Sequence, residues 1–124
     1  MNIQSDLQQV MDDIIVARDR LAGVEVSRVL RRRSVTQAEA TLAAARIALM
    51  SRSDAGTNDA QRRAYAERET MRERVELERA EELLMRADCD AIEMAATLRS
   101  HEDHRRYLET VVKLMEIGAA EPTL

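Results

Sequence analysis

Apolar residues recur at alternating spacings of three and four positions along the first part of the chain. Their positions are Ile3, Leu7, Val10, Ile14, Ala17, Leu21, Val24, Val35, Ala38, Leu42, Ala45 and Leu49, with Arg28 and Arg31 at the two intervening positions. This is the heptad spacing of a coiled-coil helix, which packs one narrow stripe of side chains against another helix. Sustained over about seven heptads, it predicts one long helix.

The second part of the chain carries the same repeat. It runs through Leu77, Ala80, Leu84, Ala87, Ala91, Met94, Leu98, His101, Arg105, Leu108, Val112 and Met115. Upstream of Leu77 the register slips, because Ala64, Met71 and Val75 fall on a different line, which is typical of a stutter.

Between the two repeats lies the stretch SRSDAGTND, residues 51–59. Gly56 suits a left-handed backbone position, and Asn58 followed by Gln61 indicates a helix start. We therefore predict an all-α fold in which a helix over 3–51, a turn over 52–58 and a helix over 59–117 form one long antiparallel two-helix coiled-coil hairpin. A short tail follows, and the whole of 1–124 is one domain. Only one Pro and 2% aromatic residues, with 34% charged residues, favour the same architecture.

Charges predict the register of this hairpin. Folding the chain back at Gly56 so that Val24 meets Ala87 places the arginines at 31–33 beside the glutamates at 78, 81 and 82. Exposed ion pairs add little stability, but they fix helix orientation and register.

Several apolar residues lie off both stripes and predict a second buried face. They are Met11, Ile15, Val26, Ile92, Ala96 and Val111. A two-helix coiled coil buries only one stripe per helix, so these side chains require a further partner. We expect a second copy, giving a homodimeric four-helix bundle, with a tetramer as the alternative.

The string HEDHRR contains His101 and His104, which share a helix face and could ligate one metal ion. Asp6 and Gln9 are the nearest candidate ligands across the hairpin, and they complete no known metal motif. We therefore predict that both histidines pack or form surface hydrogen bonds, with a metal or pH-sensing role as the alternative. Cys89 is predicted to be a small packing residue.

Composition and motifs argue against an enzyme or a general nucleic-acid binder. The formal net charge is −4, and stacking aromatics are missing around the arginines at 31–33 and around Arg62 and Arg63. If phosphate is contacted, we expect Arg62 and Arg63 near the loop to do it. The stretch VELERAEELL is similar to the paired-glutamate motif of magnesium-dependent helical nucleotide pyrophosphatases, but the matching E-x-x-D partner is absent.

The first ten residues lack a basic segment before an apolar run, so we expect no secretory signal. The longest apolar runs, such as Ile14 to Ala17, are far too short to cross a bilayer. We expect a cytoplasmic protein that does not engage a membrane.

The strings AGTNDAQRRAYAERE at 55–69 and AEELL at 80–84 carry a family resemblance. The chain resembles small uncharacterised helical-hairpin proteins of bacteriophage and prophage genomes. That resemblance implies a phage accessory role, near recombination or host-defence genes, and no catalytic residues. We expect a non-enzymatic, homo-oligomeric coiled-coil interaction or scaffold protein without a cofactor, whose partners are itself and another macromolecule. A nucleic-acid-associated accessory protein is the alternative.

Overall fold

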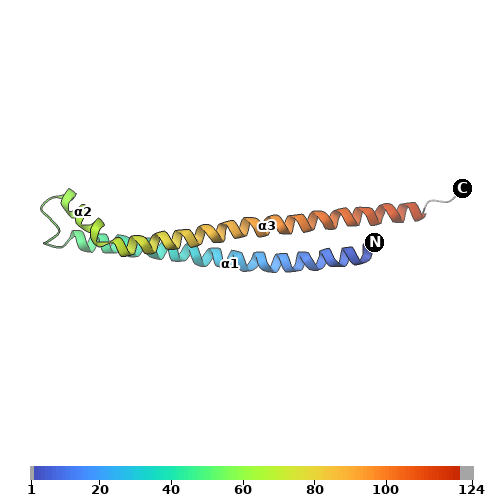
Figure 1. Ribbon diagram of the computed structural model, residues 1–124, viewed down its shortest axis with the longest axis horizontal. Helices are drawn as coiled ribbons and strands as arrows, with labels where there is room; N and C mark the ends of the chain where they lie inside the picture. Colours follow the sequence, from blue (N-terminus) through green and yellow to red (C-terminus); the bar gives the residue numbers. More distant parts are fainter. Residues whose placement is uncertain (1, 121–124) are drawn as a thin grey trace. The chain divides into compact units, whose positions relative to one another are not determined.

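The computed structural model describes residues 2–120, and this part of the chain is helical apart from its turns (Figure 1). Helix α1 spans Ile3–Met50, α2 spans Asp59–Glu69 and α3 spans Met71–Ala120. The structure assigns no strand to residues 2–120. The two long helices, α1 and α3, pack against each other, so the predicted all-α class is confirmed.

The chain divides into two compact units, and each contains a part of α1 and a part of α3. The terminal unit is Met1–Val24 with Asp90–Leu124, and the loop unit is Glu25–Cys89. Within each unit α1 and α3 run in opposite directions. Whether the whole chain behaves as one domain stays a prediction.

The heptad spacing correctly predicts which side chains become buried. In the terminal unit Val10 and Ile14 of α1 and Leu108 of α3 are each at most 6% exposed, and in the loop unit Leu42 is 5% exposed. Among the predicted stripe positions, only Arg31 and Met115 are exposed, and all others are buried or half-buried. Local spacing therefore determines the packed face of each helix.

The predicted register of α1 against α3 is wrong by about one helical turn. Within the loop unit the Arg28 Nε donates to Asp88 Oδ1 at 2.8 Å, whereas the charge pattern placed Arg28 close to Glu82. That bond raises the pKa of the Arg28 guanidinium above its ordinary value. Since most of the stripe positions are apolar, a shift of three or four residues still matches stripe with stripe.

The loop residues behave as their types predict. Gly56 has a φ of +137°, which residues with a side chain rarely adopt. The Asn58 side chain accepts a hydrogen bond from the Gln61 backbone N–H at 2.8 Å and begins α2. The Gln61 Oε1 accepts in turn from the Thr57 backbone N–H at 2.9 Å. The predicted helix start is confirmed.

The second helix is not continuous over 59–117, as the sequence predicts, because it breaks at Thr70. Thr70 has φ −106° and ψ 18°, is fully buried, and donates from its Oγ1 to the Ala66 carbonyl at 2.7 Å. Arg46 of α1 lies 2.9 Å from Glu67 of α2, which secures the short helix inside the loop unit. The slip in the heptad register falls at this break, so its signal was a helix end rather than a stutter.

Replacing Thr70 with valine is expected to lower the free energy of unfolding by about 1 kcal/mol, since the shape is kept while a buried hydrogen bond is lost. Thr97→Val is the matched control, because the Thr97 Oγ1 makes the same type of bond, to the Glu93 carbonyl at 3.0 Å, on an exposed surface. Urea denaturation would compare the two variants. Equal losses would contradict a special role for Thr70.

Candidate interaction surface

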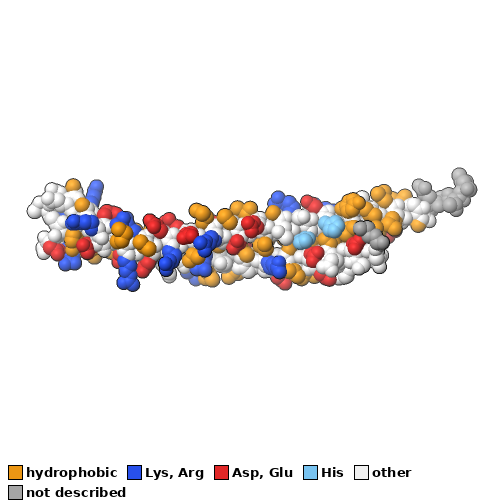
Figure 2. Space-filling view, viewed as in Figure 1, with side chains coloured by type: hydrophobic (Ala, Val, Ile, Leu, Met, Phe, Trp, Pro, Cys, Tyr) orange, Lys and Arg blue, Asp and Glu red, His pale blue; other side chains and the backbone are white. Residues whose placement is uncertain are grey.

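The terminal unit exposes large apolar side chains on the outer sides of both helices. Met11 is 45% exposed and Ile15 is 57% exposed on α1, and Ile92 is 71% exposed on α3. Ala96, one turn after Ile92, is also exposed. Met11 and Ile15 are spaced i, i+4, and so are Ile92 and Ala96, so the two members of each pair share a helix face. Apolar side chains are visible at the surface beside the two histidines in Figure 2. The exposed side chains of Met11, Ile15 and Ile92 are available to a partner.

The two other residues predicted for the interface lie in different surroundings. Val26 is 61% exposed and belongs to the loop unit. Val111 is half-buried and lines a groove between α1 and α3 of the terminal unit, so less of its surface is free for a partner.

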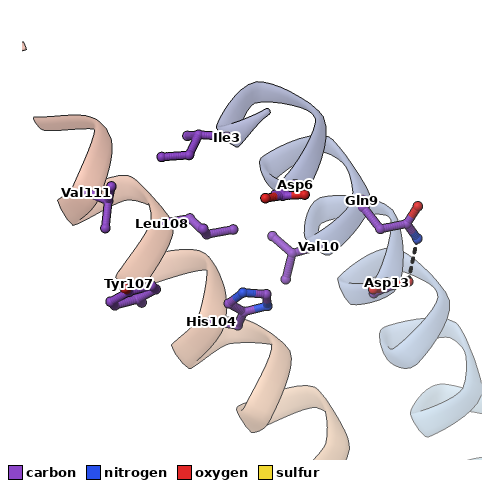
Figure 3. Close-up of a pocket in the computed structure, with 9 residues that line it drawn as sticks. All are labelled: Ile3, Asp6, Gln9, Val10, Asp13, His104, Tyr107, Leu108 and Val111. Atoms are coloured by element: carbon purple, nitrogen blue, oxygen red, sulfur yellow. Dashed lines mark hydrogen bonds between the residues drawn. The ribbon is translucent and has the colours of Figure 1, made fainter. Parts of the chain in front are cut away.

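That groove has a volume of about 440 Å³ and an apolar floor with a polar rim (Figure 3). Its floor is formed by Ile3, Val10, Leu108 and Val111, and its rim by Asp6, Gln9, Asp13, His104 and Tyr107. The Gln9 Nε2 donates to Asp13 Oδ1 at 3.0 Å. In Figure 3, Val10 of α1 and His104 of α3 project toward each other. The rim therefore carries carboxylate, amide, imidazole and phenol groups, and the residues that line this groove include no serine, threonine or cysteine.

The two histidines line different grooves. His104 is exposed and lines the groove described above together with Asp6 and Gln9, which the sequence had named as its nearest candidates. His101 is half-buried and lines a second groove with Ala17 and Met94. Within residues 2–120, no group of three or more His, Cys, Asp or Glu side chains is arranged to hold a metal ion.

Cys89 is exposed, so its prediction as a packing residue is wrong. It follows the half-buried Asp88, which accepts a hydrogen bond from Arg28. The stripe positions on either side are Ala87 and Ala91, which are both buried. Its position off the heptad stripe was the signal that could have predicted this exposure.

The arginines at the two predicted phosphate-binding clusters differ in their contacts. Arg62 donates from its Nε to the Gly56 carbonyl at 3.3 Å and so is engaged with the loop backbone. Arg63 is exposed. The arginines at 31–33 are also exposed, and among the described residues none of them forms an ion pair with the glutamates at 78, 81 and 82.

Two outer faces of the loop unit share one spacing, i, i+3, i+4 and i+7. On α1 this spacing joins Val26, Val29, Leu30 and Arg33, with Arg32 beside them, and we name this set the basic face. On α3 it joins Glu78, Glu81, Glu82 and Met85, which we name the acidic face. All members are exposed. The sequence shows this spacing. The prediction that the arginines pair with the glutamates inside one chain left no reason to look for two separate exposed faces.

No model of a protein family, no curated protein and no solved structure matches this chain. Among the described residues, no helix is long and apolar enough to cross a membrane.

Proposed function

We propose that this protein is a non-enzymatic coiled-coil interaction protein that works as a homo-oligomer. In this proposal the whole chain forms an antiparallel hairpin, and the outer helix faces of two hairpins pair to give a four-helix bundle. The observation that carries it is the exposure of Ile15 and Ile92 on the terminal unit, at 57% and 71%. Coiled-coil stripes account for the buried residues of the terminal unit and leave these two side chains without a role inside one chain.

The energetics favour association. Burying one large aliphatic side chain contributes roughly 1.5–3 kcal/mol, and a symmetric dimer buries each such residue twice. Met11, Ile15 and Ile92 therefore supply a gain of the same order as the cost of association, which is ~4–15 kcal/mol. Exposed apolar surface also lowers solubility, and in a monomer this surface would remain in contact with water.

We expect light scattering to give a mass at least twice that of one chain, which is 14.1 kDa. Ile15→Glu combined with Ile92→Glu should shift the mass toward that of a single chain, because four carboxylates would enter a dimer interface without partners. Ala44→Glu is the control, since Ala44 is exposed in the loop unit, whereas Ile15 and Ile92 belong to the terminal unit.

A wild-type mass equal to that of one chain at micromolar concentration would refute the proposal. Equal dissociation by Ala44→Glu and by the double variant would show that added charge, not the loss of Ile15 and Ile92, is responsible. Circular dichroism would establish that every variant remains helical.

A further inference from the structure

We infer that one exposed stripe of α3 is complementary to itself and pairs with the same stripe of a second copy, antiparallel and around a two-fold axis. The stripe consists of Met85, Cys89, Ile92 and Ala96, and we name it the outer stripe. This inference rests on the proposed self-association and names the surface of α3 that carries it.

The outer stripe repeats the spacing of a coiled-coil stripe on an exposed side of α3. Its residues follow one another at four, three and four positions, so they share one line along a helix that runs unbroken over Met71–Ala120. All four side chains are exposed, Met85 at 66% and Ile92 at 71%. The stripe that packs on α1 passes instead through Ala87 and Ala91, which are 6% and 5% exposed. Among residues 2–120, nothing covers the outer stripe.

The outer stripe is complementary to itself in size. We place two copies of α3 antiparallel, with Cys89 against Ile92 of the second copy. Met85 then lies against Ala96 of the second copy, because the two-fold axis relates each position to its counterpart. A large side chain faces a small one in each of these layers, which lets the two surfaces interdigitate. The two-fold axis repeats every layer, so one contact covers the outer stripes of both copies.

The charges that flank the outer stripe are complementary in the same register. Glu82 of one copy meets Arg99 of the other, and on one edge of the contact Arg86 meets Glu93 of the second copy. All four of these residues are exposed, and within residues 2–120 neither Glu93 nor Arg99 forms an ion pair. The Arg86 Nη2 donates to Glu82 Oε1 at 2.8 Å. The other oxygen of Glu82 can therefore accept from Arg99 of the second copy.

These charges also select one register. A shift of one heptad in one direction places Ile92 against Glu82 of the second copy, and a shift in the other direction places Cys89 against Arg99 of the second copy. Either shift buries an apolar residue against an isolated charge, which costs free energy. Charged positions beside an apolar stripe set the register of coiled coils in the same way.

The contact ends where the charges cease to match. Beyond residues 82–99, Glu78 and Glu81 face Asp103 and Glu102 of the second copy. Both of those partner carboxylates are already paired with an arginine inside their own chain. The complementary part of α3 is therefore the segment 82–99.

Cys89 allows a direct test, because it is the only cysteine of the chain. In this register the Cys89 residues of the two copies are three positions from direct opposition, which is ~4.5 Å along the helix axes. A short bis-maleimide adds one thiol at each end and needs no oxidant. We expect it to convert the wild type into a covalent dimer about tenfold faster than the Cys89→Ser, Ala44→Cys variant, whose single thiol is on an exposed site of α1. Denaturing electrophoresis would measure both rates.

Charge variants test the register. Glu82→Arg alone, or Arg99→Glu alone, places like charges opposite each other at both symmetry-related contacts. We expect each to self-associate about tenfold more weakly than the wild type, as measured by sedimentation equilibrium. Combining the two substitutions restores opposite charges and should recover most of the wild-type affinity. Arg63→Glu is the matched control, because it changes the net charge as Arg99→Glu does, on an exposed residue of α2 outside the contact.

The outcomes separate this inference from the proposed function. A dimeric wild type would overturn the inference and leave the proposed function standing if its Cys89 is linked no faster than the thiol of the control. The same holds if neither single charge variant weakens association, or if the combined variant associates no better than either alone. A wild type that is monomeric at micromolar concentration would overturn both. Circular dichroism on every variant distinguishes loss of association from loss of folding.

Discussion

Replacing Ile14 with alanine is expected to lower the free energy of unfolding by about 2–5 kcal/mol, which is the range for deleting a buried branched side chain and leaving a cavity. Ile14 is 2% exposed and lies in the stripe that packs α1 against α3 in the terminal unit. Its neighbours in that stripe, Val10 and Ala17, are 2% and 4% exposed, so little material is free to fill the space.

The next residue provides the control. Ile15 is 57% exposed, and Ile15→Ala removes the same atoms from a surface position. We expect it to change the stability of the dissociated chain by less than about 0.5 kcal/mol, and to weaken self-association instead. Denaturant titrations at several protein concentrations distinguish these effects, because only association makes the midpoint depend on concentration. A similar loss of stability in both variants at high dilution would contradict the assigned roles.

Replacing Gly56 with alanine is expected to lower the free energy of unfolding by about 2 kcal/mol or more. The φ of +137° is strained for any residue with a Cβ, and such strain costs about 1–3 kcal/mol. An added Cβ would also lie 2.6 Å from the Cβ of Gln61, the residue that donates its backbone N–H to the Asn58 cap of α2. The turn would have to rearrange, and the capping bond between Asn58 and Gln61 would be disturbed.

Gly23→Ala should raise the free energy of unfolding, whereas Gly56→Ala lowers it. Gly23 lies inside α1, and an added Cβ there meets nothing within 4 Å. Alanine is favoured over glycine in a helix by roughly 0.5–1 kcal/mol, so this variant should be more stable than the wild type. Thermal denaturation of the two variants under one set of conditions would measure the difference. A stabilised Gly56→Ala variant would show that the turn does not require its backbone conformation.

The orientation of the side chains beside the stripes was the part of the candidate surface that the sequence predicted least well. The sequence correctly separated Met11, Ile15, Val26 and Ile92 from the stripes, and these residues are exposed in the structure. It placed Val111 in the same group, although that side chain is half-buried in the groove. Whether a residue beside the stripe packs against the facing helix or points into solvent depends on how the two helices are rotated about their axes. The spacing of apolar residues along one helix does not specify that rotation.

The sequence by itself determined the two long helical segments and the face that each one buries. Heptad spacing predicted Val10, Ile14, Leu42 and Leu108 as packed residues, since the period of a helix is fixed by backbone geometry. The turn around Gly56 was likewise predictable, because it depends on the conformational freedom of one glycine and on one capping side chain.

Only the tertiary structure decided the register of α1 against α3 and the break at Thr70. Apolar stripes match at several shifts, and the choice falls to specific bonds such as that between Arg28 and Asp88. The register then leaves the arginines at 31–33 without the glutamates that the sequence had assigned to them. Long-range pairing depends on how two surfaces fit, whereas helical periodicity depends only on the chain's own backbone, and this difference separates what was predictable from what was not.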